Sequence, residues 1–171
     1  IQKSLYFDYS FANGRTSIDG MPSSLSSIPM FVEKFLLTPA ALNSLTSVAG
    51  ELHKKGYYTA FFHGAANGSM GFQAFSRSAG YQDYYGRTEY NNDEDFDGNW
   101  AIWDEEFLQF FANKMATFKQ PFCTGIFTAS SHHPYNIPER YKDVYKESSL
   151  PIHKCIRYSD HALQRFFETA S

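Results

Sequence analysis

The sequence is poor in cysteine, in runs of like charge and in long apolar runs, and each shortage excludes a class of protein. Two cysteines among 171 residues form at most one disulfide, which excludes a small fold held together by several disulfides. We expect Cys123 and Cys155 to be two buried thiols rather than one disulfide. The net charge of −3 comes without a basic stripe, so nucleic acid is not an expected partner. No apolar run approaches the roughly 18 residues of a membrane-spanning helix, and we expect this chain itself to be soluble.

Aromatic residues, by contrast, are abundant, at 18% of the chain with 17 Phe and 12 Tyr. This density predicts a well-packed interior and a ring-lined surface or cleft. A chain of 171 residues has the size of one domain and can bury about two-thirds of its unfolded surface. Because it opens at Ile1 on a strand-like segment, we expect it to be a piece of something larger.

The spacing of apolar residues alternates between the period of strands and the period of helices. It predicts strands over residues 4–11, 57–63 and 121–130, and helices beginning at Thr16, Ser44, Asp104 and Pro151. A short helix with an aromatic loop is expected over 72–86, and a polar surface excursion over 86–100. The last helix is expected to bury the side formed by Ile152, Cys155, Ile156, Ser159, Leu163, Phe166 and Phe167.

Strands that alternate with helices predict parallel βαβ units, and therefore an α/β fold with helices on both faces of a mainly parallel sheet. Ligands of such sheets bind at the carboxyl ends of the strands. His63 and the pair His132 and His133 follow predicted strands directly, and Thr16 follows the first strand after a turn. We therefore expect these four residues to converge at one edge of the sheet.

Thr16 lies between a Gly-Arg turn and a helix, and two interpretations of it are open. Threonine is a common N-cap, so a purely structural role accounts for its position. The same corner also presents unpaired N–H groups and the positive end of a helix dipole, which favour an anionic phosphate. At neutral pH a threonine hydroxyl would need a base or a divalent cation to act as a nucleophile.

Five ordered blocks give the chain a recognisable pattern: LYFDYSFANGRTSIDGMPSSLSSIP, GYYTAFFHGAANGSMGFQAFSRSAGYQDYYG, DGNWAIWDEEFL, PFCTGIFTASSHHPYNIPERY and YSDHALQRFF. Together they resemble the lipoteichoic-acid synthase and phosphoglycerol transferase group, which are sulfatase-like enzymes of the alkaline phosphatase superfamily. The resemblance covers most of the chain. It implies a three-layer αβα sandwich of the alkaline phosphatase type, truncated to residues 1–171.

The resemblance also implies roles for individual residues. Thr16 matches the family threonine that binds a divalent metal, typically manganese with magnesium or zinc as alternatives, and takes the phosphoryl group. His132 matches the histidine that contacts the substrate phosphate, and His63 matches a pocket histidine. The implied reaction has two steps, through a phosphoglycerol-threonine intermediate that passes to a hydroxyl or to water.

Three departures from the family pattern bear on these roles. The Trp and Arg that hold glycerol phosphate in lipoteichoic-acid synthases align here with Met70 and Phe72, which leaves the substrate open. The first acidic metal ligand would lie before Ile1, and the Asp-His metal pair would lie after Ser171. We therefore expect a partial catalytic domain without its first strand and without the later metal ligands, inactive and of marginal stability by itself.

Other candidates carry competing interpretations. His63 fits a structural hydrogen bond as well as a ligand, and His133 fits a turn before proline. Arg15 fits either phosphate steering or an exposed turn. Trp100 and Trp103 fit a pocket frame or ordinary packing. Residues 93–98 resemble the opening of a calcium loop, although a solvated acidic loop fits better because the closing glutamate is replaced by an aspartate.

The functional prediction is metal-dependent transfer or hydrolysis of a phosphoglycerol-type phosphodiester, on phospholipids or glycans at the outer surface of a membrane. The longer protein is expected to be membrane-anchored, with this domain outside the cytoplasm. A sulfatase-type ester hydrolase is one alternative, although Thr16 is not followed by the Pro and Arg of the C/S-x-P-x-R pattern. A non-catalytic module that binds headgroups or glycans is another.

Overall fold

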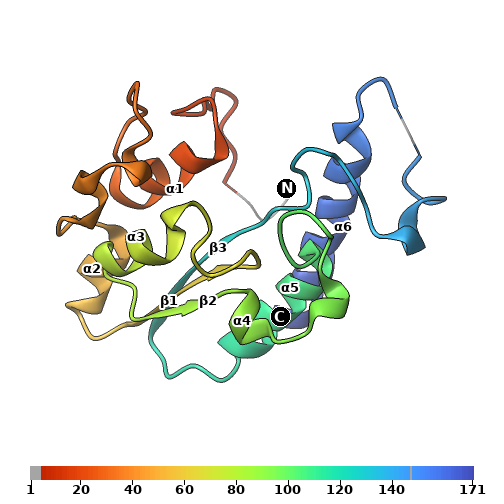
Figure 1. Ribbon diagram of the computed structural model, residues 1–171. Coiled ribbons are helices and arrows are strands. Elements are labelled where there is room, and N and C mark those ends of the chain that lie inside the picture. The colour runs from red at the N-terminus through yellow and green to blue at the C-terminus, as the bar shows by residue number, and fades with distance from the viewer. Residues whose placement is uncertain (1–4, 147) are drawn as a thin grey trace.

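The computed structural model describes residues 5–146 and 148–171 and has three parallel strands at its centre (Figure 1). They are β1 (Tyr58–His63), β2 (Asp83–Tyr85) and β3 (Phe122–Phe127), in the order β2-β1-β3. Phe62 pairs with Tyr85 on one side and with Ile126 on the other. The two longer strands end together at the pair His63 and Phe127, which brings the segments after them to the same edge of the sheet.

Helices cover both faces of this sheet, which confirms the predicted α/β sandwich (Figure 1). One layer contains α1 (Ser17–Ser26), α2 (Val48–His53) and α3 (Phe72–Ser78), and the other contains α5 (Asp104–Met115) and α6 (Ile152–Ala170). The connections include the short helix α4 (Arg87–Tyr90) and the 3-10 turns Phe35–Leu37, Pro39–Leu42, Ser69–Gly71, Asp93–Asp95 and Glu139–Tyr141.

Alternation along β1 divides the core into two aromatic clusters. Phe61 packs with Phe72 and Phe75 beneath α1, α2 and α3. Its neighbour Phe62 points to the opposite face and packs with Phe107 and Phe111 of α5. Successive side chains of a strand point to opposite faces, and the burial of β1 from Thr59 to His63 therefore fits a sheet covered on both sides.

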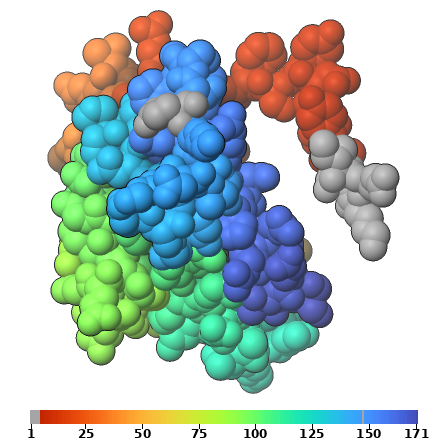
Figure 2. All heavy atoms as spheres, turned by 90° about the vertical axis from the view of Figure 1, so that its right-hand side faces the viewer, coloured from red at the N-terminus to blue at the C-terminus, as the bar shows by residue number. Residues whose placement is uncertain are grey.

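The predicted first strand is wrong for its described part. Residues 5–11 form no regular structure and are exposed, and Figure 2 shows the red N-terminal segment projecting from the rest of the molecule; residue 4 lies outside the described residues. A strand is stabilised by its hydrogen-bonded neighbour, and among the described residues no strand pairs with this segment. The β-like aromatic pattern was therefore not enough to define a strand.

Two helix starts and one strand also differ from the prediction. The cap of α2 is Ser47 rather than Ser44, because the Ser47 hydroxyl accepts the Gly50 N–H at 2.9 Å and also donates to a carbonyl of the α3–β2 turn. Trp103 holds the N-cap position of α5, and Asp104 is its first helical residue. Part of the expected aromatic loop is β2, which gains its hydrogen bonds from β1.

The buried side of α6 is rotated from the predicted one. Cys155, Tyr158 and Ala162 are fully buried, whereas the expected core residues Ile156, Leu163 and Phe167 are 52%, 42% and 66% exposed. The cysteine prediction is confirmed in part: the two thiols are not joined by a disulfide, but only Cys155 is buried and Cys123 is half-buried.

Candidate functional site

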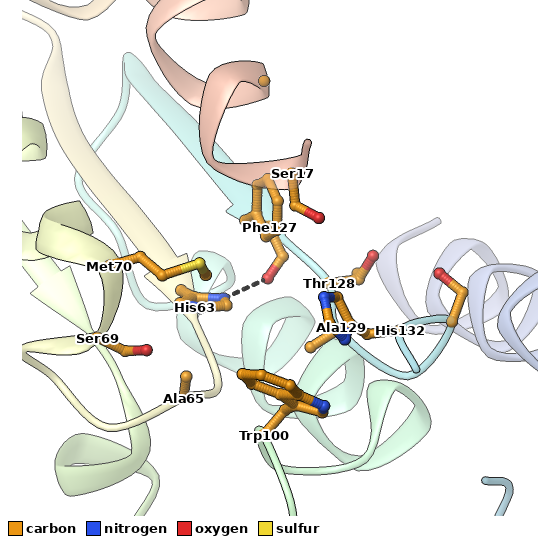
Figure 3. Close-up of a pocket in the computed structure, with 12 residues that line it drawn as sticks. Ser17, His63, Ala65, Ser69, Met70, Trp100, Phe127, Thr128, Ala129 and His132 are labelled. Atoms are coloured by element: carbon orange, nitrogen blue, oxygen red, sulfur yellow. Dashed lines mark hydrogen bonds between the residues drawn. The ribbon is translucent and has the colours of Figure 1, made fainter. Parts of the chain in front are cut away.

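A hollow of about 350 Å³ opens at the carboxyl end of the sheet (Figure 3). Ser17 from the first turn of α1, His63 from the end of β1, and His132 from the loop after β3 all line it. Trp100 lies at one wall, and Met70 lies beside His63. The structure therefore brings both predicted substrate histidines to one hollow at the predicted edge.

His63 is 1% exposed and its ring is fixed by one hydrogen bond. Its Nδ1 lies 2.9 Å from the Phe127 carbonyl oxygen, which accepts only, so Nδ1 carries the proton. Nε2 then holds a lone pair, and within the described part of the chain this buried atom has no hydrogen-bond partner. Burial lowers the pKa of His63, while the Phe127 carbonyl raises it to a smaller extent, so the ring is neutral near pH 7.

His132 is exposed and is held against Trp100. The two ring centres are 4.4 Å apart, and the Trp100 indole N–H donates to the His133 carbonyl oxygen at 2.5 Å. The same carbonyl lies 2.9 Å from Nδ1 of His132, so the proton is on Nδ1 and Nε2 remains as the outward nitrogen. Trp100 is thus both a wall of the hollow and a support for the loop of His132, which favours the pocket interpretation of this residue.

Thr16 is exposed at the N-cap of α1, directly before Ser17. It lines an adjoining hollow with residues 11–14 rather than the one that holds the histidines. Its hydroxyl donates to Asp19 Oδ2 at 2.7 Å, and Lys34 donates to the same oxygen at 2.9 Å. The hydrogen bonds from Lys34 and then from Thr16 hold the pKa of Asp19 below its ordinary value, so this carboxylate is ionised and orients the hydroxyl.

The remaining candidates lie outside the hollow of the two histidines. Arg15 is exposed and does not line it. The ring of His133 packs near Tyr135, and Trp103 packs against Tyr158. Their positions fit the turn and packing interpretations.

The acidic segment uses its carboxylates for contacts within the protein. Asp93 bonds Arg87 at 2.7 Å, and Asp97 accepts backbone N–H groups of residues 99–101. Asp95 accepts hydrogen bonds from Tyr90 and Asn92. These contacts fit a structured acidic loop better than a calcium loop.

A metal site is not assembled by this part of the chain. Across residues 5–146 and 148–171, no group of three or more His, Cys, Asp or Glu side chains is placed to hold a metal ion. Thr16 and Asp19 together offer two oxygen atoms that are already engaged with each other. The donor set therefore does not fit a metal centre by itself, and the prediction that further ligands lie outside this sequence stays a prediction.

Sequence reasoning missed two supporting carboxylates. Asp19 was not singled out, although its spacing of three from an N-cap threonine is a capping signal. Asp104 was considered only as the start of a helix and as the aspartate in place of the closing glutamate of a calcium loop, whereas its side chain bonds the loop of His132. Asp104 bonds Ala129 and Ser130, which follow it by 25 and 26 positions in the chain, and no local sequence pattern predicts a contact over that separation.

Comparison with known proteins shows which family this chain is similar to. The sulfatase family model matches residues 2–171. Lipoteichoic acid synthase 1 of Bacillus subtilis is 24% identical over 157 residues, covering 89% of this chain and 23% of that protein. The lipoteichoic acid synthase of Staphylococcus saprophyticus is 25% identical over 167 residues, covering 94% of this chain and 26% of that protein. The chain thus spans about a quarter of the length of these curated relatives.

Solved structures agree on the fold. A protein of the alkaline phosphatase superfamily from Vibrio parahaemolyticus superposes with a TM-score of 0.79 at 25% identity, over 93% of this chain and 40% of that one. The lipoteichoic acid synthase LtaP from Listeria monocytogenes gives 0.76 at 21% identity, over 92% and 41%. With the family match across the described site, the chain belongs to the sulfatase family of the alkaline phosphatase superfamily.

Proposed function

We propose that this chain is the part of a phosphodiester-cleaving enzyme that supplies the nucleophile Thr16 and two substrate contacts, His63 and His132. The observation that carries the proposal is that Ser17, next to Thr16, lines one hollow together with both histidines. The reaction class is transfer or hydrolysis of a phosphoglycerol-type group. In the first step the threonine oxygen forms a bond to phosphorus, and the bond to the leaving alcohol breaks.

The contacts of Thr16 decide what else the reaction requires. Asp19 accepts the hydroxyl hydrogen bond, but its lowered pKa makes it a weak base, so it orients the hydroxyl better than it removes the proton. Sulfatase-superfamily enzymes typically use divalent metals. We keep manganese, with magnesium or zinc as alternatives, as a proposed cofactor of a longer protein in which Thr16 is one ligand.

His132 and His63 have different proposed roles because their surroundings differ. His132 is exposed at the hollow, and when its ring carries a second proton, on the outward Nε2, this N–H can bond a phosphate oxygen and then pass its proton to the leaving alcohol. His63 is buried and neutral, and its free lone pair suits a hydroxyl donor of the substrate better than a phosphate oxygen. A polyol phosphodiester presents both groups.

The physiological substrate is proposed to be a phospholipid or glycan outside the cytoplasmic membrane, with the longer protein anchored there. Two relatives are named for the synthesis of lipoteichoic acid, which supports an envelope substrate. Of the helices in residues 5–146 and 148–171, none is long and apolar enough to cross a membrane.

Turnover by a longer protein that contains this chain tests the proposal. With manganese, we expect hydrolysis of bis(p-nitrophenyl) phosphate, and loss by about a thousandfold or more in Thr16→Ala, because removing a nucleophile eliminates the covalent route. Ser17→Ala removes the adjacent hydroxyl, which lines the hollow, and turnover clearly above that of Thr16→Ala would show that this hydroxyl is not the nucleophile. Preference for p-nitrocatechol sulfate would favour the sulfatase alternative, and ligand binding without turnover would favour a binding module. Full activity of Thr16→Ala would refute the assignment of Thr16 as the nucleophile.

A further inference from the structure

The first residue of α5 is a buried carboxylate that bonds the loop carrying His132. Asp104 is 3% exposed. Its Oδ1 accepts the N–H groups of Ala129 at 2.9 Å and Ser130 at 3.1 Å, and its own N–H donates to the Ser130 hydroxyl at 2.9 Å. Its Oδ2 accepts the Ser159 hydroxyl of α6 at 3.1 Å. Four hydrogen bonds therefore join α5, the chain after β3, and α6 at one buried point.

The bonded amides, of Ala129 and Ser130, lie three and two residues before His132, the proposed substrate contact. The N–H of His132 donates to the Ala129 carbonyl at 3.0 Å, so the turn that carries the imidazole starts from a residue fixed by Asp104. Trp100 holds the other side of the turn through the His133 carbonyl. Trp100 also precedes α5 closely in sequence, so one segment supports the loop from two directions.

The neighbouring carboxylate bonds the same connection further along the chain. Glu105 accepts hydrogen bonds from Arg140 at 2.7 Å and from Tyr141 at 2.8 Å. Figure 2 shows the segment from about residue 128 to 146, in cyan to blue, on the outer surface of the molecule. Asp104 and Glu105 thus bond this connection at its start and near its middle, and only the start, held by Asp104, adjoins His132.

We propose that Asp104 is a positioning residue, which fixes the loop so that the imidazole of His132 faces the hollow. This rests on the proposed function, in which His132 contacts the substrate. A carboxylate forms stronger bonds to backbone N–H groups than a neutral acceptor does, and here it satisfies two amides that water reaches poorly. Without the carboxylate, the amides of Ala129 and Ser130 would lose their acceptor, and the bond from the backbone N–H of residue 104 to the Ser130 hydroxyl would remain beside the Trp100 contact.

Nuclear magnetic resonance of the ¹⁵N-labelled chain tests the positioning without any need for activity. The Trp100 indole N–H reports the loop, and Trp100→Phe assigns it against Trp103. In Asp104→Ala we expect this resonance to shift, and the amides of Ala129 and Ser130 to exchange with water about tenfold faster or more. Asp104→Asn keeps one acceptor oxygen without the charge. In this variant the Trp100 indole should resonate at its wild-type position, while the amides of Ala129 and Ser130 should still exchange faster than in the wild type.

Glu105→Gln is the matched control, because it alters the adjacent carboxylate of the same helical turn. It should leave the Trp100 indole unchanged. The proposal is wrong if Asp104→Ala leaves the indole and both amides as in the wild type, or if Glu105→Gln shifts the indole equally. If Asp104→Ala does not fold, Asp104→Asn decides: unchanged exchange at Ala129 and Ser130 contradicts the proposal.

A double-mutant cycle in a longer active protein links the positioning to the reaction. If Asp104 acts through His132, Asp104→Asn should lower kcat/KM in the wild-type background and have no further effect in His132→Ala. Additive losses in the double variant would contradict action through His132. Absence of turnover in the unmutated protein would instead refute the proposed function, and the resonance measurements would still decide the role of Asp104.

Discussion

At the scale of single residues, hydrogen bonds and burial distinguish the two site histidines, whose roles cannot be told apart from the residue type alone. Both site histidines bond a backbone carbonyl through Nδ1, which fixes the same tautomer in each. His63 is buried and neutral, whereas His132 is exposed beside Trp100. The sequence placed the two imidazoles at the correct edge of the sheet, but it contains no signal for burial at one position and exposure at the other.

The lowered pKa of His63 predicts a pH dependence of stability. On acidification from about pH 7.5 to 5, the unfolded histidine gains a proton while the buried ring resists it, so the unfolded state binds more protons and the free energy of unfolding falls. His63→Asn keeps an N–H donor for the Phe127 carbonyl but does not titrate. Urea unfolding across this range should show a shallower pH dependence in His63→Asn, and equal slopes would contradict the prediction.

At the scale of elements, the spacing of apolar residues was a reliable guide where the sequence of a helix or strand is enough to specify its secondary structure. The helices over Ser17–Ser26 and Asp104–Met115 and the strand Tyr58–His63 were predicted from apolar spacing and confirmed. The short strand Asp83–Tyr85 was missed because three residues carry no period. The face of α6 was misplaced because two apolar stripes run along that helix and only packing on α5 selects between them.

A close approach between α2 and the turn after α3 gives a stability prediction. Gly80 has φ +85°, and a Cβ there would lie 2.6 Å from the Gly50 Cα. Gly56 has a similar φ of +87°, but a Cβ there would meet nothing within 4 Å. Both alanine variants carry the strain of about 1–2 kcal/mol of a left-handed residue, and Gly80→Ala should lose about 1–3 kcal/mol more because α2 must shift.

Urea denaturation of the two alanine variants measures this difference. Equal losses of unfolding free energy in Gly56→Ala and Gly80→Ala would mean that the contact with Gly50 is relaxed without cost. Such a result would contradict the tight packing of α2 against the α3–β2 turn.

At the scale of the whole molecule, the sequence predicted the layers and the location of the site, because alternating strands and helices have few ways to pack. The contacts that complete the site are long-range: Asp104 reaches Ala129, and Trp100 reaches His133. Such pairs depend on how the layers meet, which local patterns do not encode. The described sheet also ends at β3, all six residues of which are only half-buried.

The composition of the site predicts how this chain treats metal ions. Since the described residues place no group of three His, Cys, Asp or Glu side chains together, we expect no micromolar manganese binding by these 171 residues. Isothermal titration calorimetry of the chain with manganese chloride measures this. Stoichiometric binding at micromolar concentration would show that the chain carries a metal site of its own.

The central claim is that the oxygen of Thr16 takes the phosphoryl group, although the adjacent Ser17 is the residue that lines the hollow of the histidines. Peptide mass mapping of a longer active protein, quenched in acid during turnover of a glycerol phosphodiester, tests this most directly. We predict a phosphoglycerol mass increase on Thr16 that is absent from Thr16→Ala and present in Ser17→Ala. An adduct located on Ser17, or continued turnover of Thr16→Ala, would contradict the account.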